Sequence, residues 1–328
     1  MVHFLSCDWG TSSFRLRLVD AESADIIAFR KADRGIAATF NNLDDRKKED
    51  PEQRLLFYLR IIQEHISEIE QDQNISLKGV PLVISGMASS SIGMAELPYR
   101  NLPFSIDGSD IEAAYFEVSA NFAHPVLLIS GVKSEVDVMR GEETQLIGTI
   151  RDSTAVEGQV LYIFPGTHSK HIVVKGKQVI DFKTYMTGEF FALLSKQSIL
   201  KGVVEWNDDL QTPNALQSFK EGVRDAKGAN LLHMAFRVRT NDLFEKLTKK
   251  ENYHYLSGLL IGAELDGIKP SDYAQVSVCS DSGLRLSYET ALETLGLKEK
   301  AHVFPDEWTD EAVVRGQLKI YKQFTRKL

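Results

Sequence analysis

The sequence has no apolar run near the roughly 18 residues that a membrane-spanning helix needs, so we expect no membrane insertion. Its N-terminus lacks the basic stretch and the full apolar core of a signal peptide, because Asp8 follows too soon. Only two cysteines are present, Cys7 and Cys279, and they lie far apart in the chain. They cannot form a disulfide framework, so a reducing cytoplasm is the simplest location.

Basic residues are also too few for a nucleic-acid-binding surface. The chain has 38 Lys and Arg against 46 Asp and Glu, for a formal net charge of -8. Non-specific nucleic-acid binding needs clustered Lys and Arg, so we expect no such partner. Small anionic substrates are compatible with this charge, because a few local cations suffice to hold them. The basic stretch 319–328 is typical of a solvated last helix.

Several catalytic motifs are missing. The sequence contains no G-x-G-x-x-G, no G-x-x-x-x-G-K-[ST] and no G-x-S-x-G, which argues against a Rossmann dinucleotide site, a P-loop enzyme and an α/β-hydrolase. His168 and His171 have an H-x-x-H spacing, but residues three apart on a strand face opposite sides. We therefore expect no shared zinc ion there.

The 328 residues, 43% of them hydrophobic, are enough for two domains. Apolar or alternating runs at 2–9, 14–20 and 25–31 predict a β-meander, and 159–184 repeats this pattern. Helices are predicted at 51–70, 142–150, 190–200, 255–266 and 285–295, and further strands at 80–85, 126–132 and 275–280. We therefore predict two α/β lobes, 1–155 and 156–328, each opening with a meander.

The first candidate loop follows the first strand. Asp8 ends that strand, Gly10, Thr11 and Ser12 form a tight turn, and Arg15 begins the next strand. Backbone N–H groups and hydroxyls in such a turn can donate to phosphate oxygens, and Arg15 can pair with phosphate charge. Asp8 can hold Mg²⁺ directly or through water. The alternative is a plain hairpin turn, since Asp, Gly, Thr and Ser all favour turns.

The second candidate loop has the same place in the second half. Gly166, Thr167 and Ser169 lie between two apolar strands, and Lys170 could contact an anion or be solvated. Two such hairpins, one in each half, favour a site for a polyphosphate more strongly than one does.

A third element combines charges at the start of a helix. Asp137 and Arg140 precede Glu142 and Glu143. The helix dipole accounts for one acidic residue in the first turn but not for Asp137 and Arg140. A carboxylate here can accept a proton from a substrate hydroxyl, so Glu142 or Asp137 is the candidate catalytic base, with Glu142 favoured because it opens the helix.

The two Gly-Thr hairpins, with Asp8 and Arg15, resemble the sugar kinase/Hsp70/actin superfamily. Segments 139–148, 165–174, 186–194 and 255–265 are similar to the 2-dehydro-3-deoxygalactonokinase family over nearly the whole chain. The resemblance implies two ribonuclease H-like lobes with an interdomain cleft. It implies ATP and Mg²⁺ as cofactors and phosphorylation of 2-dehydro-3-deoxy-D-galactonate, or a close acidic sugar, on its 6-hydroxyl. The N-terminal lobe would bind the sugar, and residues 275–295 would bind adenosine.

An acidic substrate implies an arginine that holds its carboxylate. Arg140 is the first choice and Arg34 the second, and Ser90 and Glu96 lie in a segment that matches the family. The alternative for Arg140 is an internal pair with a neighbouring glutamate.

The sequence also departs from the family pattern. Ser91, Ile92 and Met94 replace Arg, Gln and Trp, and Ser280 followed by Asp281 stands where a Gly is expected. If the first three shape the sugar pocket, the acid sugar would differ. A sugar sensor or an ATP-hydrolysing switch is therefore the alternative function. The chain can be a monomer or a homo-oligomer.

Overall fold

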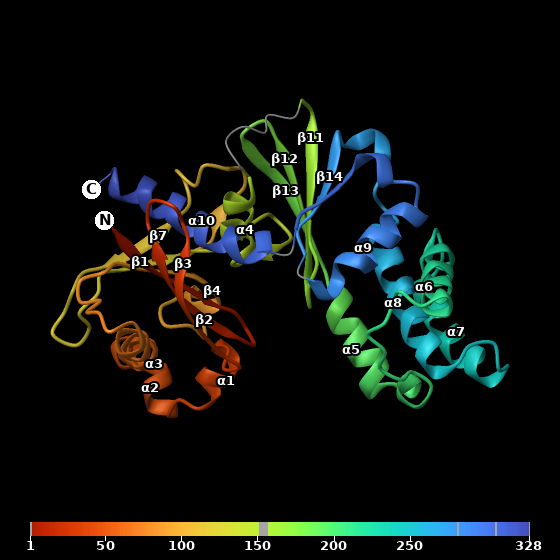
Figure 1. Ribbon diagram of the computed structural model, residues 1–328, viewed down its shortest axis with the longest axis horizontal. Helices are drawn as coiled ribbons and strands as arrows, with labels where there is room; N and C mark the ends of the chain where they lie inside the picture. Colours follow the sequence, from red (N-terminus) through yellow and green to blue (C-terminus); the bar gives the residue numbers. More distant parts are fainter. Residues whose placement is uncertain (1, 151–156, 281, 306, 328) are drawn as a thin grey trace. The chain divides into compact units, whose positions relative to one another are not determined.

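The computed structural model describes residues 2–150, 157–280, 282–305 and 307–327 (Figure 1). The chain divides into two compact units. The first comprises Met1–Thr154, Lys177–Asp181 and Thr309–Leu328, and the second Ala155–Gly176 and Phe182–Trp308. The sequence predicted two consecutive lobes, whereas the structure joins the C-terminal residues to the first unit. The predicted boundary itself, at 155–156, lies outside the described residues.

A six-stranded sheet in the order β3-β2-β1-β4-β8-β7 forms the centre of the first unit. Its strands are β1 (His3–Trp9), β2 (Phe14–Asp20), β3 (Ile26–Ala32), β4 (Leu82–Gly86), β7 (Ala113–Phe116) and β8 (Val126–Ile129). The first three are antiparallel, and β1, β4 and β8 are parallel. This is the predicted meander followed by parallel strands. The carboxyl ends of β1 and β4 therefore meet at one edge of the sheet.

The other elements of the first unit surround this sheet. They are α1 (Ile36–Asn41), α2 (Asp45–Glu49), α3 (Pro51–Gln73), the 3₁₀ turn η1 (Met87–Ser89), β5 (Arg100–Asn101), β6 (Phe104–Ser105), β9 (Val132–Lys133), β10 (Val138–Met139), α4 (Glu142–Thr149) and α10 (Glu307–Thr325). Helix α3 begins where the Asp50 carboxylate accepts hydrogen bonds from the N–H groups of Glu52 and Gln53.

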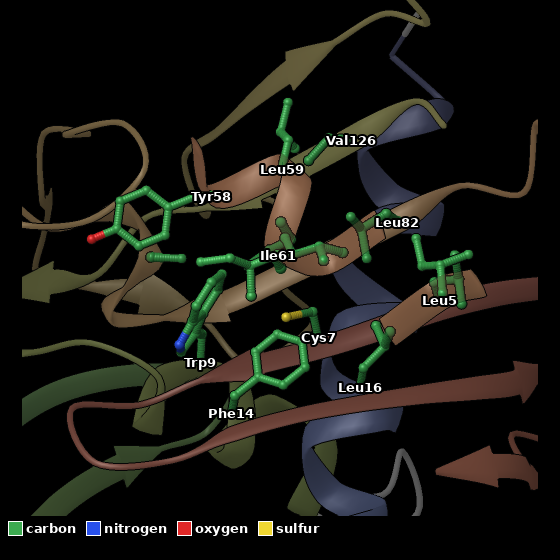
Figure 2. Packing of buried hydrophobic residues seen from close by; sticks show 14 of the residues in the cluster. Leu5, Cys7, Trp9, Phe14, Leu16, Tyr58, Leu59, Ile61, Leu82 and Val126 are labelled. Carbon is green, nitrogen blue, oxygen red and sulfur yellow. The ribbon is translucent and has the colours of Figure 1, made fainter. Parts of the chain in front are cut away.

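The apolar face of α3 packs on the sheet. Trp9 belongs to this core, with edge-on ring contacts to Phe14 and Tyr58 at centroid distances of 4.8 and 5.2 Å (Figure 2). All three rings are buried. Burial of a large aromatic side chain stabilises a fold by about 1.5–3 kcal/mol. Trp9 follows Asp8 directly, so this packing also holds the end of β1 that carries the first candidate loop.

Helix α10 belongs to the first unit because it packs backbone to backbone on α4. A Cβ atom at Gly148 would lie 1.7 Å from the carbonyl oxygen of Ala312, and one at Gly316 1.9 Å from that of Thr144. The buried Gln317 amide donates to a carbonyl oxygen of β1 and to a hydroxyl of β4, both at 2.8 Å. The stretch 319–328 was predicted to be a solvated last helix. Its residues up to Thr325 end α10, and Lys322, Thr325, Arg326 and Lys327 are exposed, as predicted. The docking of the upstream part was not predicted, because a basic composition does not reveal the small residues there.

The sheet of the second unit continues the same plan, with β15-β14-β11-β12-β13 as neighbours. Its strands are β11 (Gln159–Phe164), β12 (Ser169–Lys175), β14 (Gln275–Val278), β15 (Ala301–Val303) and β13 (Gln178–Tyr185), of which Gln178–Asp181 are counted with the first unit. Strands β11 and β12 are antiparallel, whereas β11, β14 and β15 are parallel. Both units therefore have the predicted ribonuclease H-like α/β arrangement.

The helical part of the second unit is larger than predicted. It contains α5 (Thr187–Gln197), η2 (Ile199–Gly202), α6 (Pro213–Ala226), α7 (Leu231–Leu243), α8 (Lys249–Leu265), η3 (Pro270–Asp272), α9 (Ser282–Thr294) and η4 (Lys298–Lys300). Helices α5, α8 and α9 correspond to predicted ones, while α6 and α7 were missed. Helix α6 contacts the α8 backbone closely, because Gly222 and Gly258 carry no Cβ. Within the described residues, no helix is long and apolar enough to cross a membrane.

Candidate active site

Asp8 lies at the carboxyl end of β1, beside the end of β4. The register of β1 with β2 pairs Asp8 with Arg15, whose Nη1 donates to the Asp8 Oδ2 at 3.2 Å. The Asp8 side chain is 19% exposed. Gly86 ends β4 with a φ of 87°, and a Cβ there would lie 3.3 Å from the Asp8 Oδ1. Glycine at this position keeps space beside the carboxylate.

The turn at 10–13 presents its hydroxyls to solvent. The Gly10 N–H donates to the carbonyl oxygen of Ser13 at 2.9 Å, which closes the turn and leaves Thr11 and Ser12 exposed. The start of α1 packs against it, because a Cβ at Gly35 would lie 2.0 Å from the Thr11 carbonyl oxygen. The first loop therefore has a fixed backbone and exposed hydroxyl side chains, which suits binding of a phosphate group.

Arg34 lies at the rim of this loop. Its carbonyl oxygen accepts a hydrogen bond from the Trp9 indole N–H at 3.1 Å, and its side chain is exposed. Glu96 is also exposed. Ser90 is buried, and its hydroxyl donates to the carbonyl oxygen of Met87 at 2.7 Å. These three residues lie in different surroundings, although all three were candidates for sugar binding.

Two of the three departures in the segment 86–99 are packing residues. Met94 is 1% exposed and belongs to the core under α3, and Ile92 packs against the same core. The Tyr58 hydroxyl donates to the Ile92 carbonyl oxygen at 2.6 Å, and Arg54 donates to that of Ser91 at 3.1 Å. Only Ser91 has an exposed side chain. Met94 therefore fills the core and does not line a sugar pocket.

The Arg140 guanidinium is held by neutral groups. Its Nη1 donates to the carbonyl oxygen and the hydroxyl of Ser89, at 2.7 and 2.5 Å, and its Cζ lies 4.2 Å from the centre of the Tyr99 ring. Its Nε is buried and has no hydrogen-bond partner within the described residues. Glu142 binds the backbone N–H of Arg140 at 3.1 Å. The charge of Arg140 is thus held in place by contacts that do not neutralise it.

Glu143 is a second, buried carboxyl at this turn. It is 1% exposed, and its oxygens accept from the Gly141 N–H at 2.7 Å and from the Thr144 hydroxyl at 2.9 Å. Burial, and secondly the negative charge of Glu142, raise its pKa to about 7. The turn packs on the end of β4, since a Cβ at Gly141 would lie 3.4 Å from the Gly86 Cα. The third element is thus near Asp8.

Substitution Glu143→Gln should change how stability depends on pH. The pKa of this carboxyl rises from an ordinary 4.5 to about 7 on folding, so its contribution is complete below 4.5 and lost as the pH rises through 7. The upper bound is about 3.5 kcal/mol, at about 1.4 kcal/mol per pKa unit. Urea denaturation gives the free energy of unfolding at pH values of about 5.5 and 8. The difference between these two free energies should be smaller for Glu143→Gln than for the unmodified chain. Equal differences would contradict the assignment.

Asp137 occupies a turn outside this cluster. Its backbone N–H donates to the Ser134 hydroxyl at 2.9 Å, its carbonyl oxygen accepts from the Ser134 N–H at 2.9 Å, and its Oδ1 accepts from the Val138 N–H at 2.7 Å. It lines an open cavity of about 1100 Å³ within the first unit. These contacts fit a turn-stabilising role for Asp137.

The second loop, in the other unit, has exposed and buried parts. Thr167 and His168 are exposed, and the His168 Nε2 lies 2.5 Å from the Glu189 Oε2. Ser169 is fully buried, and its Oγ accepts from the Gly166 N–H at 3.3 Å. Ser169 was predicted to contact phosphate, but the structure places its hydroxyl beneath the loop.

Lys170 and His171 follow this loop on β12, and both are buried. The Lys170 Nζ donates to the His168 carbonyl oxygen at 3.2 Å. His171 contacts Glu264 at 2.9 Å, whereas His168 contacts Glu189. The two histidines therefore contact two different glutamates.

Comparisons with known proteins agree on one family. A sequence model of the family described as 2-keto-3-deoxy-galactonokinase matches residues 8–320. A probable 2-dehydro-3-deoxygalactonokinase of Rhizobium meliloti (strain 1021), DgoK1, is 29% identical over 307 residues, which cover 91% of this chain and 92% of that protein. The 2-dehydro-3-deoxygalactonokinase of Escherichia coli (strain K12) is 31% identical over 225 residues, 66% of this chain and 71% of that protein.

A solved structure extends the similarity to the fold. The crystal structure of a candidate 2-dehydro-3-deoxygalactonokinase from Sinorhizobium meliloti matches with a TM-score of 0.79 and 27% identity, covering 97% of this chain and 96% of that one. The residues that the family model matches, 8–320, include both candidate loops and the turn at 139–142. The chain therefore belongs to the 2-keto-3-deoxy-galactonokinase family.

Proposed function

We propose that this protein is an ATP-dependent kinase that phosphorylates 2-dehydro-3-deoxy-D-galactonate on its 6-hydroxyl. The observation that carries the proposal is a family match over 8–320, which includes both phosphate-type loops. The named relatives are kinases, and they lend no support to a sensor or switch. Both cysteines are buried and neither forms a disulfide, which is compatible with action in a reducing cytoplasm.

The first loop suits the phosphates of ATP. The exposed Thr11 and Ser12 hydroxyls can donate to phosphate oxygens, Gly10 closes the turn that carries them, and Arg15 adds positive charge. Asp8 fits a Mg²⁺ ion, since its carboxylate is partly exposed and glycine leaves space beside it. When bound, Mg²⁺ neutralises phosphate charge.

In the second unit, Gly166 and the exposed hydroxyl of Thr167 are the candidate phosphate contacts. Ser169 acts from below, since its buried hydroxyl binds the Gly166 N–H. The strand and helix at 275–295 remain our candidate for adenosine, with Ser280 in that segment and Asp281 outside the described residues.

Glu142 is the better candidate for the base. It is the first residue of α4 and follows Gly141, which packs against the end of β4. Asp8, on β1, lies beside that end of β4. Asp137 instead stabilises its own turn. In the reaction, the 6-hydroxyl proton moves to the Glu142 carboxylate while the hydroxyl oxygen bonds to the terminal phosphorus of ATP. The bond from that phosphorus to the bridging oxygen breaks, and ADP leaves.

Arg140 is the candidate for the carboxylate of the sugar. Its guanidinium is oriented by Ser89 and Tyr99, and its buried Nε has an unused hydrogen. A planar guanidinium can bind a carboxylate through two parallel hydrogen bonds. Arg34 and Glu96 are exposed, and Ser90 is bonded to its own turn, so any contact they make with the sugar is secondary.

The preference for acidic sugars tests this assignment. We expect kcat/KM to fall at least tenfold from the acid to a neutral analogue that lacks the carboxylate, because the half-buried guanidinium of Arg140 would lose its charged partner. Arg140→Lys should flatten this preference, since lysine cannot form the paired contact. Coupled detection of ADP gives kcat/KM for the acidic sugar and for its neutral analogue. Equal kcat/KM for acidic and neutral sugars would contradict the acid-sugar proposal.

A further inference from the structure

A network of polar side chains lies beneath the second loop. It consists of Ser169, His171, Thr187, Glu264 and Tyr288, which come from β12, α5, α8 and α9. All but Thr187 are at least nine-tenths buried. The proposed chemistry does not use Glu264, yet a buried carboxylate is costly unless it is well bonded. A function of the Glu264 carboxylate is therefore expected in its hydrogen bonds.

One branch of the network ends at the loop backbone. The Tyr288 hydroxyl contacts the Glu264 Oε2 at 2.8 Å and the Ser169 Oγ at 3.0 Å. A carboxylate can only accept, so the tyrosine donates to Glu264 and its oxygen accepts from the Ser169 hydroxyl. Burial and the nearby carboxylate raise the pKa of Tyr288, which keeps its proton in place. The Ser169 oxygen is then oriented to accept the Gly166 N–H at 3.3 Å.

A second branch reaches the loop through α5. The Thr187 hydroxyl donates to the Glu264 Oε2, which fixes the first turn of α5. That turn lies against the loop, because a Cβ at Gly188 would lie 2.6 Å from the Gly166 carbonyl oxygen. The Glu189 N–H also donates to the Thr167 carbonyl oxygen at 3.1 Å. His171 holds the other oxygen of Glu264 at 2.9 Å.

We infer that Glu264 is a positioning residue for nucleotide binding, acting on the loop at 166–169 through Tyr288 and Ser169. The inference rests on the proposed function, which gives that loop the phosphates of ATP. One carboxylate binds both the tyrosine that supports the loop and the helix turn that packs on it. It thereby holds Gly166 and Thr167 in one conformation before ATP arrives, and preorganisation of this kind strengthens binding.

The test is nucleotide affinity in full-length variants. Tyr288→Phe keeps the ring but removes the link between Glu264 and Ser169. We expect the Kd for ADP, measured by titration calorimetry, to rise about tenfold, as for loss of one hydrogen bond to a charged group. Ser169→Ala, a smaller change, should raise it in the same direction. The KM for ATP should rise while the KM for the sugar stays within about twofold.

Tyr255→Phe is the matched control, since it removes a partly buried hydrogen bond of 2.7 Å to Asp225, in the same unit but outside the network. It should leave the Kd for ADP unchanged. Wild-type affinity in both folded Tyr288→Phe and Ser169→Ala would overturn the inference, as would an equal loss in Tyr255→Phe. If the unmodified chain binds neither ATP nor ADP, it is the proposed function that fails.

Discussion

Replacing Asp8 with asparagine should reduce turnover at least about 100-fold and leave the fold intact. This loss corresponds to about 2.7 kcal/mol of barrier. Asparagine keeps the shape of the side chain and can still contact Arg15, but it removes the negative charge at the end of β1. In our proposal that charge holds the metal ion beside the phosphates, so its loss acts on the chemical step. Release of ADP in the presence of the sugar measures kcat.

Asp20→Asn provides the control, because Asp20 lies at the opposite end of the same hairpin and its carboxylate accepts hydrogen bonds from the N–H groups of Glu22 and Ser23 in its own turn. We expect its turnover to stay within about twofold of the unmodified chain. Thermal unfolding should show that both variants are folded. Near-normal kcat in a folded Asp8→Asn variant would remove the phosphate-loop assignment.

Glu142→Gln should lower kcat by about 10² to 10⁴, the usual contribution of a general base. The glutamine keeps an oxygen for the Arg140 N–H, so the turn should retain its shape. Because the change affects proton transfer and not the phosphate loops, the affinity for ATP should remain unchanged. Rapid-quench measurement of a single turnover, together with calorimetric titration of ATP, separates the two effects.

Asp137→Asn is the comparison for this experiment. Asparagine preserves an acceptor for the Val138 N–H, so we expect kcat close to that of the unmodified chain. The opposite pattern, with kcat lost in Asp137→Asn alone, would transfer the base to Asp137. Full kcat in both variants would place the base elsewhere.

Much of the fold could be predicted because its signals are local. The alternation in β2 and the apolar spacing of α3 come from residues within one element, and both were recognised. The docking of α10 could not be predicted, because it depends on Gly148 and Gly316 meeting across more than 160 residues of chain. Helices α6 and α7 were missed although α6 is strongly amphipathic, so its signal was present and not used.

The candidate site likewise has features that the sequence predicts and features that only the tertiary structure shows. Asp8, Gly10 and Thr11 were predicted to bind phosphate because the order of residue types matches that chemistry, and the structure brings them together at the end of β1. Glu143 and Glu264 were not singled out, since a glutamate in a helix is usually solvated and only tertiary structure shows that these two are buried. Ser169 was recognised as part of the loop, but its inward direction depends on Tyr288, 119 positions away.

The most direct test of the central claim is the release of ADP from ATP with and without 2-dehydro-3-deoxy-D-galactonate, followed by identification of the sugar product by NMR. We expect ADP to form at least about 100-fold faster with the sugar, in equal amounts with a product phosphorylated on its 6-hydroxyl. Sugar-independent formation of ADP would indicate an ATP-hydrolysing switch. The absence of any phosphorylated sugar, with a folded protein that binds both ligands, would contradict the kinase assignment.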